Sequence, residues 1–386
     1  MMQPKICLDS KKVALIRNVG WEDFGGGEIY QLMLAAELIK CGYEVIIVTS
    51  SRKLIKEAKL RGIRSVTPPY IRRQDWSGWK NILLPVYVVY QARLRRWYRK
   101  FYRDYGIGTI NVQSRDDLIA AARAIKPRDN IKMIWTDHAD LGSWVFVNLD
   151  KPFRNIIGRW ILKYARKASA IIVVSEAERK KIEKKIFPRE LKNMVVIRNG
   201  VIDEFEKYKN IKANRGSFCF VGRVVREKGI FELIEAFLKL NKDYPEATLN
   251  VYGDGEALKG CIVKARKCSG IKFYGMVRNV LPELARNSCF VLPSHKEGLS
   301  LSLVEAAMMR KAIIASDIDS NKEVINDGKD GLIVHVGDID DLWKAMAYII
   351  DCGEDARKFS LNAREAYEAK FNFADIVKKE ILPLIS

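Results

Sequence analysis

The segment from Leu292 to Ser316 constrains the fold more than any other part of the chain. It reads L-P-S-H-K-E-G-L-S-L-S-L-V-E-A-A-M-M-R-K-A-I-I-A-S. The apolar run Cys289–Leu292 predicts a buried strand, a helical pattern follows over about 300–309, and Ala312–Ala315 predicts a second buried strand. Strand, loop, helix and strand in this order form the unit of a parallel sheet. In such a sheet, ligands bind at the carboxyl ends of the strands.

Two glutamates, Glu297 and Glu305, lie near the predicted start of this helix. One interpretation is ordinary acidic charge near a helix N-terminus, where the helix dipole favours it. The other is an anion-binding site, because a helix N-terminus also presents backbone N–H groups to a ligand. Taken alone, the two glutamates favour the first interpretation. Whether the second applies depends on the residues at the other strand ends of the same sheet.

Length and composition limit the class of protein. A chain of 386 residues with 48% hydrophobic and 30% charged residues predicts a globular protein of two domains. No apolar run approaches the eighteen or so residues of a membrane-spanning helix, and the first residues lack a signal-peptide pattern. A cytoplasmic location is expected. Seven scattered cysteines without a C-x-x-C pair, and three histidines, argue against a disulfide framework or a zinc site.

The net charge of +20 is unevenly distributed. Residues 1–200 carry 39 Lys and Arg against 19 Asp and Glu, whereas residues 201–386 carry 28 of each. The surplus therefore belongs to the N-terminal half. Such an asymmetry predicts an anionic partner for that half, of which nucleic acid, anionic lipid and a phosphorylated substrate are the candidates.

Strand and helix patterns alternate through both halves, which predicts an α/β fold with two doubly wound parallel sheets. We expect a first Rossmann-like domain at residues 1–200, a polar linker at 201–216 and a second Rossmann-like domain at 217–370. Residues 371–386 are expected to form a C-terminal helix that packs back on the first domain.

Several predicted strand ends of the second half carry residues suited to a nucleotide. Gly222 and Arg223 end one strand, and Lys228 opens the next helix, so that two cations flank one crevice and can neutralise a diphosphate. Gly253 ends the following strand, and glycine there lets a flat ring approach the backbone. After the next strand, the backbone of Met276 or Val277 is placed to pair with a base edge.

These motifs together resemble the retaining glycosyltransferases of family 4, which have the GT-B architecture of two Rossmann-like domains. The resemblance rests on G-R-x-x-x-E-K-G from Gly222, the Y-G-D-G-E turn, F-Y-G, and P-S-x-x-E-G-L-S-L-S-L-V-E-A-A from Pro293. It covers the C-terminal half densely and the N-terminal half thinly. It implies an enzyme that moves a hexose-type sugar from a UDP- or GDP-sugar to an acceptor hydroxyl, with retention at the anomeric carbon. The acceptor class it implies is a lipid-linked or cell-envelope glycan precursor.

The resemblance also implies roles for residues of the second half. Arg223 and Lys228 bind the diphosphate and stabilise it as it leaves, and this electrostatic chemistry requires no metal or other cofactor. Glu305 accepts hydrogen bonds from the ribose hydroxyls, and Glu297 lies beside the donor sugar. Backbone N–H groups at the helix N-terminus cap the distal phosphate, and these belong to Leu299, Ser300 and Leu301.

In the first half the resemblance covers two places. Gly26 and Gly27 belong to a glycine-rich loop between a predicted strand and helix, as in the family's first loop, which approaches the donor phosphate; a flexible linker loop is the alternative. His138 follows a predicted strand, where the family often has a histidine near the donor sugar and the acceptor. The family usually has an acidic residue directly after it. Here Ala139 intervenes before Asp140, which leaves the partner of His138 open.

A basic stretch in the first half suggests a membrane surface. Residues 80–105 combine aliphatic, aromatic and basic side chains, among them Trp97, Tyr98, Phe101 and Tyr102, and residues 179–185 form a second basic cluster. An interfacial helix on anionic lipid and a core helix with a solvated basic face both fit this pattern. If both segments face one side, peripheral attachment to the inner face of the membrane follows.

The main alternative function is a basic protein of the same fold that binds nucleic acid or an anionic membrane without transferase activity. Nucleic acid is disfavoured, because Glu297 and Glu305 would repel a phosphate backbone and no RNA- or DNA-reading motif occurs.

Overall fold

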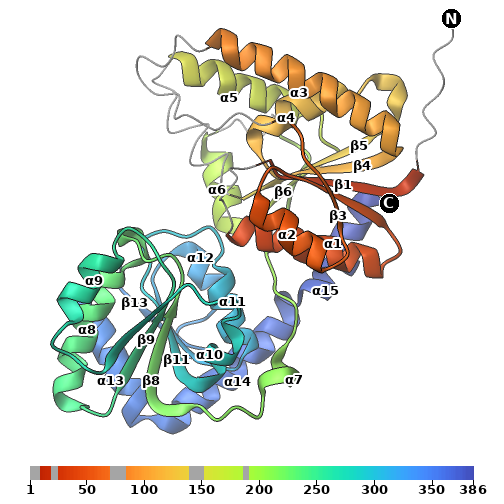
Figure 1. The fold of residues 1–386 in the computed structure, drawn as a ribbon. Helices are drawn as coiled ribbons and strands as arrows, with labels where there is room; N and C mark the ends of the chain where they lie inside the picture. The colour runs from red at the N-terminus through yellow and green to blue at the C-terminus, as the bar shows by residue number, and fades with distance from the viewer. Residues whose placement is uncertain (1–8, 19–24, 70–83, 139–151, 186–190) are drawn as a thin grey trace, which may run out of the picture. The chain divides into compact units, whose positions relative to one another are not determined.

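The structure, a computed structural model, describes residues 9–18, 25–69, 84–138, 152–185 and 191–386. It divides into two compact units. Unit 1 comprises residues 1–197 together with 374–386, and unit 2 comprises residues 198–373. Each unit is a parallel sheet with helices on both faces (Figure 1).

Unit 1 is built on a seven-stranded sheet in the order β3-β2-β1-β4-β5-β6-β7. All its strand pairs are parallel, and the inner strand β1 is fully buried from Val13 to Ile16. The chain leaves β1 toward β2 on one side and returns on the other side at β4, so the topological switch point lies between β1 and β4. The strands are β1 (Asp9–Ile16), β2 (Glu44–Val48), β3 (Arg64–Val66), β4 (Ile107–Val112), β5 (Lys132–Asp137), β6 (Ala170–Val173) and β7 (Met194–Val196).

The helices of unit 1 cover its sheet on two sides, with α3, α4 and α5 together on one of them (Figure 1). A 3₁₀ turn, η2 (Pro127–Asp129), follows α4. The α-helices before the tail are α1 (Gly26–Lys40), α2 (Arg52–Leu60), α3 (Leu84–Tyr105), α4 (Arg115–Ala124), α5 (Pro152–Ala165) and α6 (Glu176–Lys185).

The aromatic residues of α3 belong to the core. Tyr98, Phe101 and Tyr102 are all at most 3% exposed, and Trp97 is partly buried against them. The Tyr98 hydroxyl donates a hydrogen bond to Asp117 Oδ1 at 2.6 Å. For these aromatic side chains the core interpretation of the basic stretch applies, and the interfacial interpretation does not.

The last thirteen residues fold onto unit 1. They form α15 (Phe373–Ile376), a π-helical turn η5 (Val377–Ile381) and α16 (Leu382–Ile385). Here η5 contacts α1 and α16 contacts β5, while the Thr109 hydroxyl donates to the Ile385 carbonyl at 3.4 Å.

Unit 2 has a six-stranded parallel sheet in the order β10-β9-β8-β11-β12-β13. Its switch point lies between β8 and β11, by the same reasoning as in unit 1. The apolar runs predicted as strands are its most buried segments. The strands are β8 (Asn214–Val221), β9 (Thr248–Tyr252), β10 (Ile271–Gly275), β11 (Asn287–Leu292), β12 (Ala312–Ser316) and β13 (Leu332–Val334).

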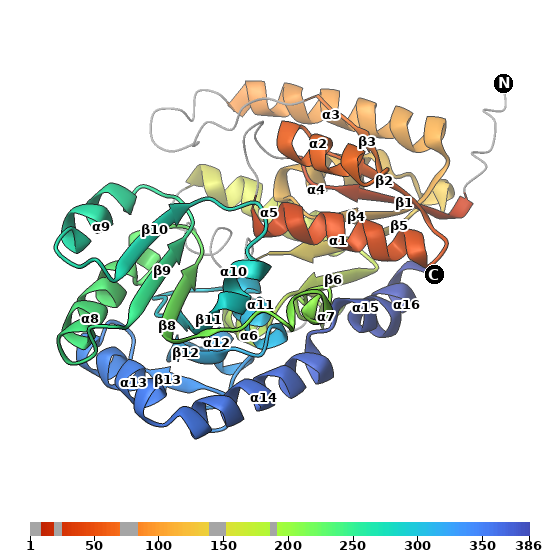
Figure 2. The ribbon, with the colours of Figure 1, turned by 60° about the horizontal axis from the view of Figure 1, so that its bottom comes forward.

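The helices of unit 2 lie in two layers, with α8, α9 and α13 on one side of the sheet and α10, α11 and α14 on the other (Figure 2). A 3₁₀ turn, η4 (Arg226–Lys228), precedes α8. The helices are α7 (Phe205–Tyr208), α8 (Ile230–Asp243), α9 (Leu258–Ala265), α10 (Leu281–Arg286), α11 (Leu301–Met308), α12 (Asp319–Lys322), α13 (Ile339–Asp351) and α14 (Gly353–Lys370).

The segment 201–216, predicted as a linker, is instead part of unit 2. Val201 is 4% exposed, its N–H donates to the Phe371 carbonyl at 3.1 Å, and its carbonyl accepts from the Phe373 N–H at 3.0 Å. The segment also contains α7 and the first residues of β8. Its polar composition misled the prediction, because short helices and strand starts need few apolar residues. Among the described residues, no helix has the length and apolarity needed to cross a bilayer.

Candidate functional site

The carboxyl edge of unit 2 brings the predicted residues together at its switch point. The turn η4 after β8 ends at Gly229, whose φ of 65° lies in the left-handed region that favours glycine. A Cβ on Gly229 would stand 2.0 Å from the carbonyl oxygen of Pro293, which directly follows β11. The start of α8 therefore lies in direct contact with the end of β11.

Glycines also allow the backbones at the ends of β8, β9 and β10 to lie in direct contact with one another. A Cβ on Gly253 would stand 1.8 Å from the Gly222 carbonyl oxygen. The Gly222 N–H donates to the Tyr252 carbonyl at 3.0 Å, and the Gly253 N–H donates to the Gly275 carbonyl at 2.8 Å. The ends of β8, β9 and β10 thus form one continuous backbone surface without side chains at three positions, which a flat ligand can approach.

Lys228 and Glu297 form an ion pair across the switch point. Lys228 Nζ donates to Glu297 Oε1, and the two side chains are 17% and 10% exposed. Ser294 Oγ donates to the same carboxylate oxygen at 2.7 Å. The resemblance implied that Lys228 binds the diphosphate and that Glu297 lies beside the donor sugar; in the free protein these two residues bind each other.

A buried polar layer supports this pair, and sequence reasoning did not find it. Ser294, Ser316 and Asn321 are 0% exposed. The Asn321 amide donates to the Ser316 carbonyl at 3.0 Å and to its hydroxyl at 3.2 Å, and Ser320 Oγ donates to the Glu297 carbonyl at 3.3 Å. The only sequence signal was polar side chains directly after buried strands.

Glu305 lies on α11, partly buried. Within the described part of the chain its carboxylate has no hydrogen bond or ion pair. Burial raises the pKa of Glu305 to about 7. A carboxylate held in this way gains from any ligand that donates hydrogen bonds to it.

The other predicted residues of unit 2 surround this edge. Arg223 follows β8 and is exposed, and Met276 is exposed after β10 with Val277 half-buried. Leu299 and Ser300 are each 7% exposed and lead into α11, whose first residue is Leu301. Ser300 Oγ bonds Ser302 Oγ at 3.0 Å and does not cap the helix, so the first N–H groups of α11 have no side-chain partner at Ser300.

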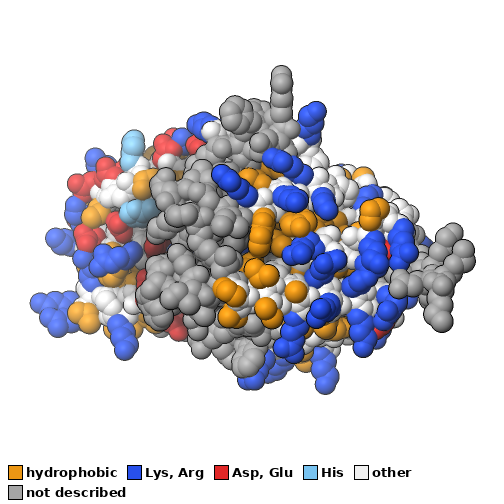
Figure 3. Space-filling model, turned by 90° about the horizontal axis from the view of Figure 1, so that it is seen from above, with side chains coloured by type: hydrophobic (Ala, Val, Ile, Leu, Met, Phe, Trp, Pro, Cys, Tyr) orange, Lys and Arg blue, Asp and Glu red, His pale blue; other side chains and the backbone are white. Residues whose placement is uncertain are grey.

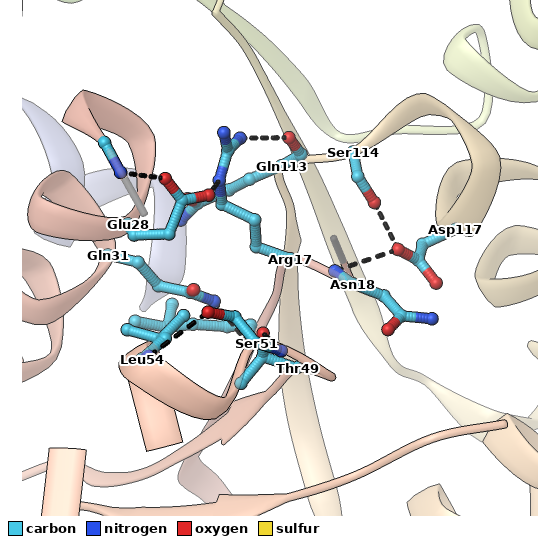
Figure 4. A network of polar contacts seen from close by, with 12 residues as sticks. Arg17, Asn18, Glu28, Gln31, Thr49, Ser51, Leu54, Gln113, Ser114 and Asp117 are labelled. Atoms are coloured by element: carbon cyan, nitrogen blue, oxygen red, sulfur yellow. Dashed lines mark hydrogen bonds and ion pairs between the residues drawn. The ribbon is translucent and has the colours of Figure 1, made fainter. Parts of the chain in front are cut away.

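The corresponding edge of unit 1 carries a polar cluster at its own switch point (Figure 4). Arg17, directly after β1, donates from Nε to Glu28 Oε1 at 2.6 Å and from Nη1 to the Gln113 carbonyl at 3.1 Å. The second oxygen of Glu28 accepts the Gly25 N–H at 2.7 Å. Sequence reasoning missed Arg17 and Gln113, because neither belongs to a motif.

The glycines predicted in unit 1 open its first helix. Gly26 is the first residue of α1, and Gly27 follows. A Cβ on Gly27 would stand 2.3 Å from the guanidinium carbon of Arg17, so glycine allows the arginine to lie against the start of α1.

His138 directly follows β5, as predicted. Its ring meets that of Tyr30 edge to face, with the centroids 5.0 Å apart. Burial, together with the positive charge of Arg17, lowers the pKa of His138 to about 3. The imidazole is therefore neutral near pH 7. The sequence left the partner of His138 open, because Ala139 stands where the family usually has an acidic residue; Ala139 and Asp140 both lie outside the described residues.

A doubly wound sheet with cations and close glycines at its switch point, and a nearby carboxylate without a partner among the described residues, resembles the arrangement in nucleotide-binding α/β proteins. Two family models match the chain: glycosyl transferases group 1 over residues 201–366, and glycosyltransferase family 4 over residues 24–205. These two models cover residues 24–366 between them, and both are glycosyltransferase families of the kind that the motifs predicted.

Relatives and solved structures agree with this family. The chain is 28% identical over 261 residues to an uncharacterized glycosyltransferase of Methanocaldococcus jannaschii, covering 63% of this chain and 66% of the relative. It is 26% identical over 253 residues to the Escherichia coli UDP-Gal:alpha-D-GlcNAc-diphosphoundecaprenol alpha-1,3-galactosyltransferase, covering 61% and 65%. The matches thus span just under two thirds of these relatives. Anabaena HepE in complex with UDP and glucose superimposes with a TM-score of 0.74 at 16% identity, covering 97% of this chain and 99% of HepE. The fold is GT-B, as expected.

Proposed function

We propose that the protein is a retaining glycosyltransferase that moves a hexose from a UDP- or GDP-sugar to an acceptor hydroxyl. The observation that supports this most directly is the switch point of unit 2, where Lys228, Glu297 and the close glycines meet. A nucleoside diphosphate-sugar offers phosphates to the lysine and hydroxyls to the carboxylate. The family and the fold support the same class of donor.

In the proposed reaction the bond between the anomeric carbon and the leaving phosphate oxygen breaks, and the acceptor oxygen forms the new bond on the same face. The acceptor proton passes to the leaving phosphate. Arg223 and Lys228 stabilise the negative charge that develops on the diphosphate, together with the N-terminus of α11. This electrostatic stabilisation needs no metal, so we propose that activity persists in a chelator.

Each remaining residue has a part in holding the donor. Glu305 accepts hydrogen bonds from the ribose hydroxyls and Glu297 from the donor sugar. Backbone groups of Met276 and Val277 pair with the base. His138, neutral at pH 7, can exchange hydrogen bonds with sugar hydroxyls without adding charge.

Donor binding tests the proposal. We expect UDP- or GDP-sugars to raise the melting temperature of the wild type and to be slowly hydrolysed, with and without EDTA. Lys228→Ala should abolish the shift. Lys264→Ala is the matched control, because Lys264 is ion-paired with Glu235 on the surface of the same unit. If no donor shifts the wild type, the proposal is wrong.

The acceptor we propose is a lipid-linked or envelope glycan precursor, reached at an anionic membrane surface. The matched E. coli relative is named for a diphosphoundecaprenol acceptor. In this chain, Val86, Val88 and Val89 near the start of α3 are 46%, 43% and 68% exposed. Figure 3 shows hydrophobic side chains on this face of unit 1 with Lys and Arg around them. Apolar residues within a basic surface suit an anionic interface.

The basic residues of α3 do not all serve this surface. Arg95 donates to the Arg123 carbonyl at 3.0 Å and Arg99 to the Ala124 carbonyl at 2.9 Å, so both cap the end of α4. In the second predicted segment, 179–185, Arg179 is bonded to Glu183 at 2.8 Å within α6. Three exposed cations of α3 that follow the valines make no such bond to any residue that the structure describes: Arg93, Arg96 and Lys100.

Vesicle sedimentation tests the membrane contact. Each basic residue near an anionic surface contributes about 1 kcal/mol, so reversing Arg93, Arg96 and Lys100 to Glu should lower binding to phosphatidylglycerol vesicles by at least about tenfold. The control reverses three exposed cations of unit 2, Lys259, Arg266 and Lys267, with the same change in net charge. Equal loss in both variants would show a general charge effect and contradict the proposed surface.

A further inference from the structure

The side chain of Gln113 is buried without a hydrogen bond. Gln113 directly follows β4 at the switch point of unit 1 and is 1% exposed. Within the described part of the chain neither its Oε1 nor its Nε2 has a hydrogen-bond partner. A buried amide without partners is costly, and native proteins rarely keep one unless something else satisfies it.

The amide two residues earlier on the same strand is satisfied at both of its polar atoms. Asn111 lies two residues earlier on β4 and donates to Thr136 Oγ1 at 2.9 Å. Gln31 of α1 donates to the Leu15 carbonyl at 2.8 Å, so among the described residues only its Oε1 is unsatisfied, whereas Gln113 has no partner at either atom. The unsatisfied amide of Gln113 lies at the carboxyl ends of the strands, where an α/β sheet binds its ligand.

The neighbours of Gln113 define the chemistry of that ligand. The strand register pairs Leu15 with Asn111 and Asn111 with Ile134, which places Arg17, Gln113 and Thr136 at the next level of the sheet. The charge of Arg17 is balanced by Glu28 at 2.6 Å. His138, near enough for its pKa to respond to Arg17, is neutral. The Arg17–Glu28 ion pair and the neutral His138 place Gln113 beside groups that suit sugar hydroxyls better than a phosphate.

We propose that Gln113 is a specificity-determining residue that binds hydroxyls of an uncharged sugar ring. The amide N–H donates to one hydroxyl oxygen and the amide oxygen accepts from another hydroxyl, so that binding satisfies both groups. The inference rests on the proposed glycosyltransferase function. The ring belongs either to the donor sugar or to the acceptor, and both present the same chemistry.

Stability of the unliganded protein gives the first test. Gln113→Leu keeps the volume and removes two unsatisfied polar groups, so it should raise the urea midpoint. Asn111→Leu, on the same strand and face, loses a hydrogen bond and should lower it. If Gln113→Leu lowers the midpoint as Asn111→Leu does, Gln113 is a structural residue and the proposal is overturned.

Ligand binding gives the second test and distinguishes the two sources. Calorimetry with UDP alone, with UDP-glucose and with UDP-galactose is compared between wild type and Gln113→Leu. NMR titration with methyl glycosides of glucose, galactose and N-acetylglucosamine provides the acceptor probe. A loss of about tenfold for UDP-sugars with UDP unchanged assigns the hydroxyls to the donor. A similar loss confined to the methyl glycosides assigns them to the acceptor.

The remaining outcomes are also decisive. Unchanged affinity for every sugar that binds the wild type overturns the role of Gln113, even if donors bind normally. If the wild type binds no UDP- or GDP-sugar, the proposed function itself fails. That result is distinct from the first, because it needs no variant.

Discussion

At the scale of single residues, the carboxyl edge of each sheet keeps polar groups that the free protein does not fully satisfy. Glu305 in unit 2 is a partly buried carboxylate whose pKa is raised to about 7. His138 in unit 1 is a partly buried imidazole whose pKa is lowered to about 3. Both shifts disfavour the charged form, and both reduce the stability of the free protein on one side of the pH scale. A ligand that bonds these groups can return that stability.

The charge of Glu305 gives a pH-dependent prediction. Between its ordinary pKa of 4.5 and about 7, the native state binds more protons than the unfolded state, so stability falls as pH rises. Glu305→Gln should therefore be more stable than wild type above pH 7, by roughly 2 kcal/mol given the partial exposure of the side chain, and equal below pH 4.5. Urea unfolding at several pH values measures this. A difference that does not depend on pH would contradict the assignment.

The positions of these residues could be predicted, whereas their pairings could not. Gly222 and Lys228 stand at strand or helix ends, Glu297 lies in the loop between β11 and α11, and Glu305 lies within α11; the pattern of apolar runs locates these elements. The ion pair between Lys228 and Glu297 joins residues 69 apart, through the packing of the start of α8 on the end of β11. Gln113 belongs to no motif, and only its surroundings show that its amide lacks partners.

At the scale of elements, α8 depends on one glycine. Gly229 ends η4, precedes α8 and has a positive φ, and its missing side chain leaves room for the Pro293 carbonyl. The contact between Gly229 and Pro293 fixes the start of α8 against the end of β11. Lys228 is the residue just before Gly229. The geometry of the ion pair therefore rests on the backbone of Gly229.

Gly229→Ala should accordingly be strongly destabilising. The left-handed conformation costs a non-glycine residue about 1–3 kcal/mol, and the clash with Pro293 adds to this. Gly353→Ala is the control, because a Cβ there meets nothing within 4 Å and α14 begins at that residue; it should change stability by less than about 1 kcal/mol. Denaturant midpoints measure both variants. Equal midpoints would mean that the α8 start is not fixed by this contact.

Buried strands were the elements best predicted, because four or more apolar residues between polar turns have few other uses. The predicted run Cys289–Leu292 is the buried centre of β11, and Ala312–Ala315 that of β12. The prediction was weaker where charge dominates, as in the segment 201–216 and in α3. In α3 the spacing of Leu94, Tyr98 and Phe101 indicates a buried face, but the surrounding arginines obscured it.

At the scale of the whole molecule, the C-terminal tail completes the core of unit 1, which the N-terminal half begins. The tail after residue 373 belongs to unit 1, although unit 2 lies between the two in sequence. Val377 and Ile381 are fully buried and Ile385 is 2% exposed. Unit 1 therefore cannot reach its final core before the tail is present.

Ile381→Ala should destabilise unit 1 selectively, by about 2–5 kcal/mol as for other large-to-small changes in a core. Hydrogen exchange is the measurement, with faster exchange expected in β4 and β5 and little change in β11 and β12. Lys379→Ala, a surface residue of the same turn paired with Asp375, should change stability by at most about 0.5 kcal/mol. Uniform acceleration in both units would show that they unfold together.

In the donor site that we propose, the ion pair between Lys228 and Glu297 should weaken the binding of inorganic phosphate alone. If inorganic phosphate binds Lys228, the Glu297 carboxylate loses its ion pair and keeps the hydrogen bond from Ser294. This costs free energy, because the Glu297 side chain is only 10% exposed. A molecule that carries both phosphate and hydroxyls replaces each half of the pair at once. In the donor site that we propose, the resting contact would therefore select against inorganic phosphate and favour molecules that carry both groups.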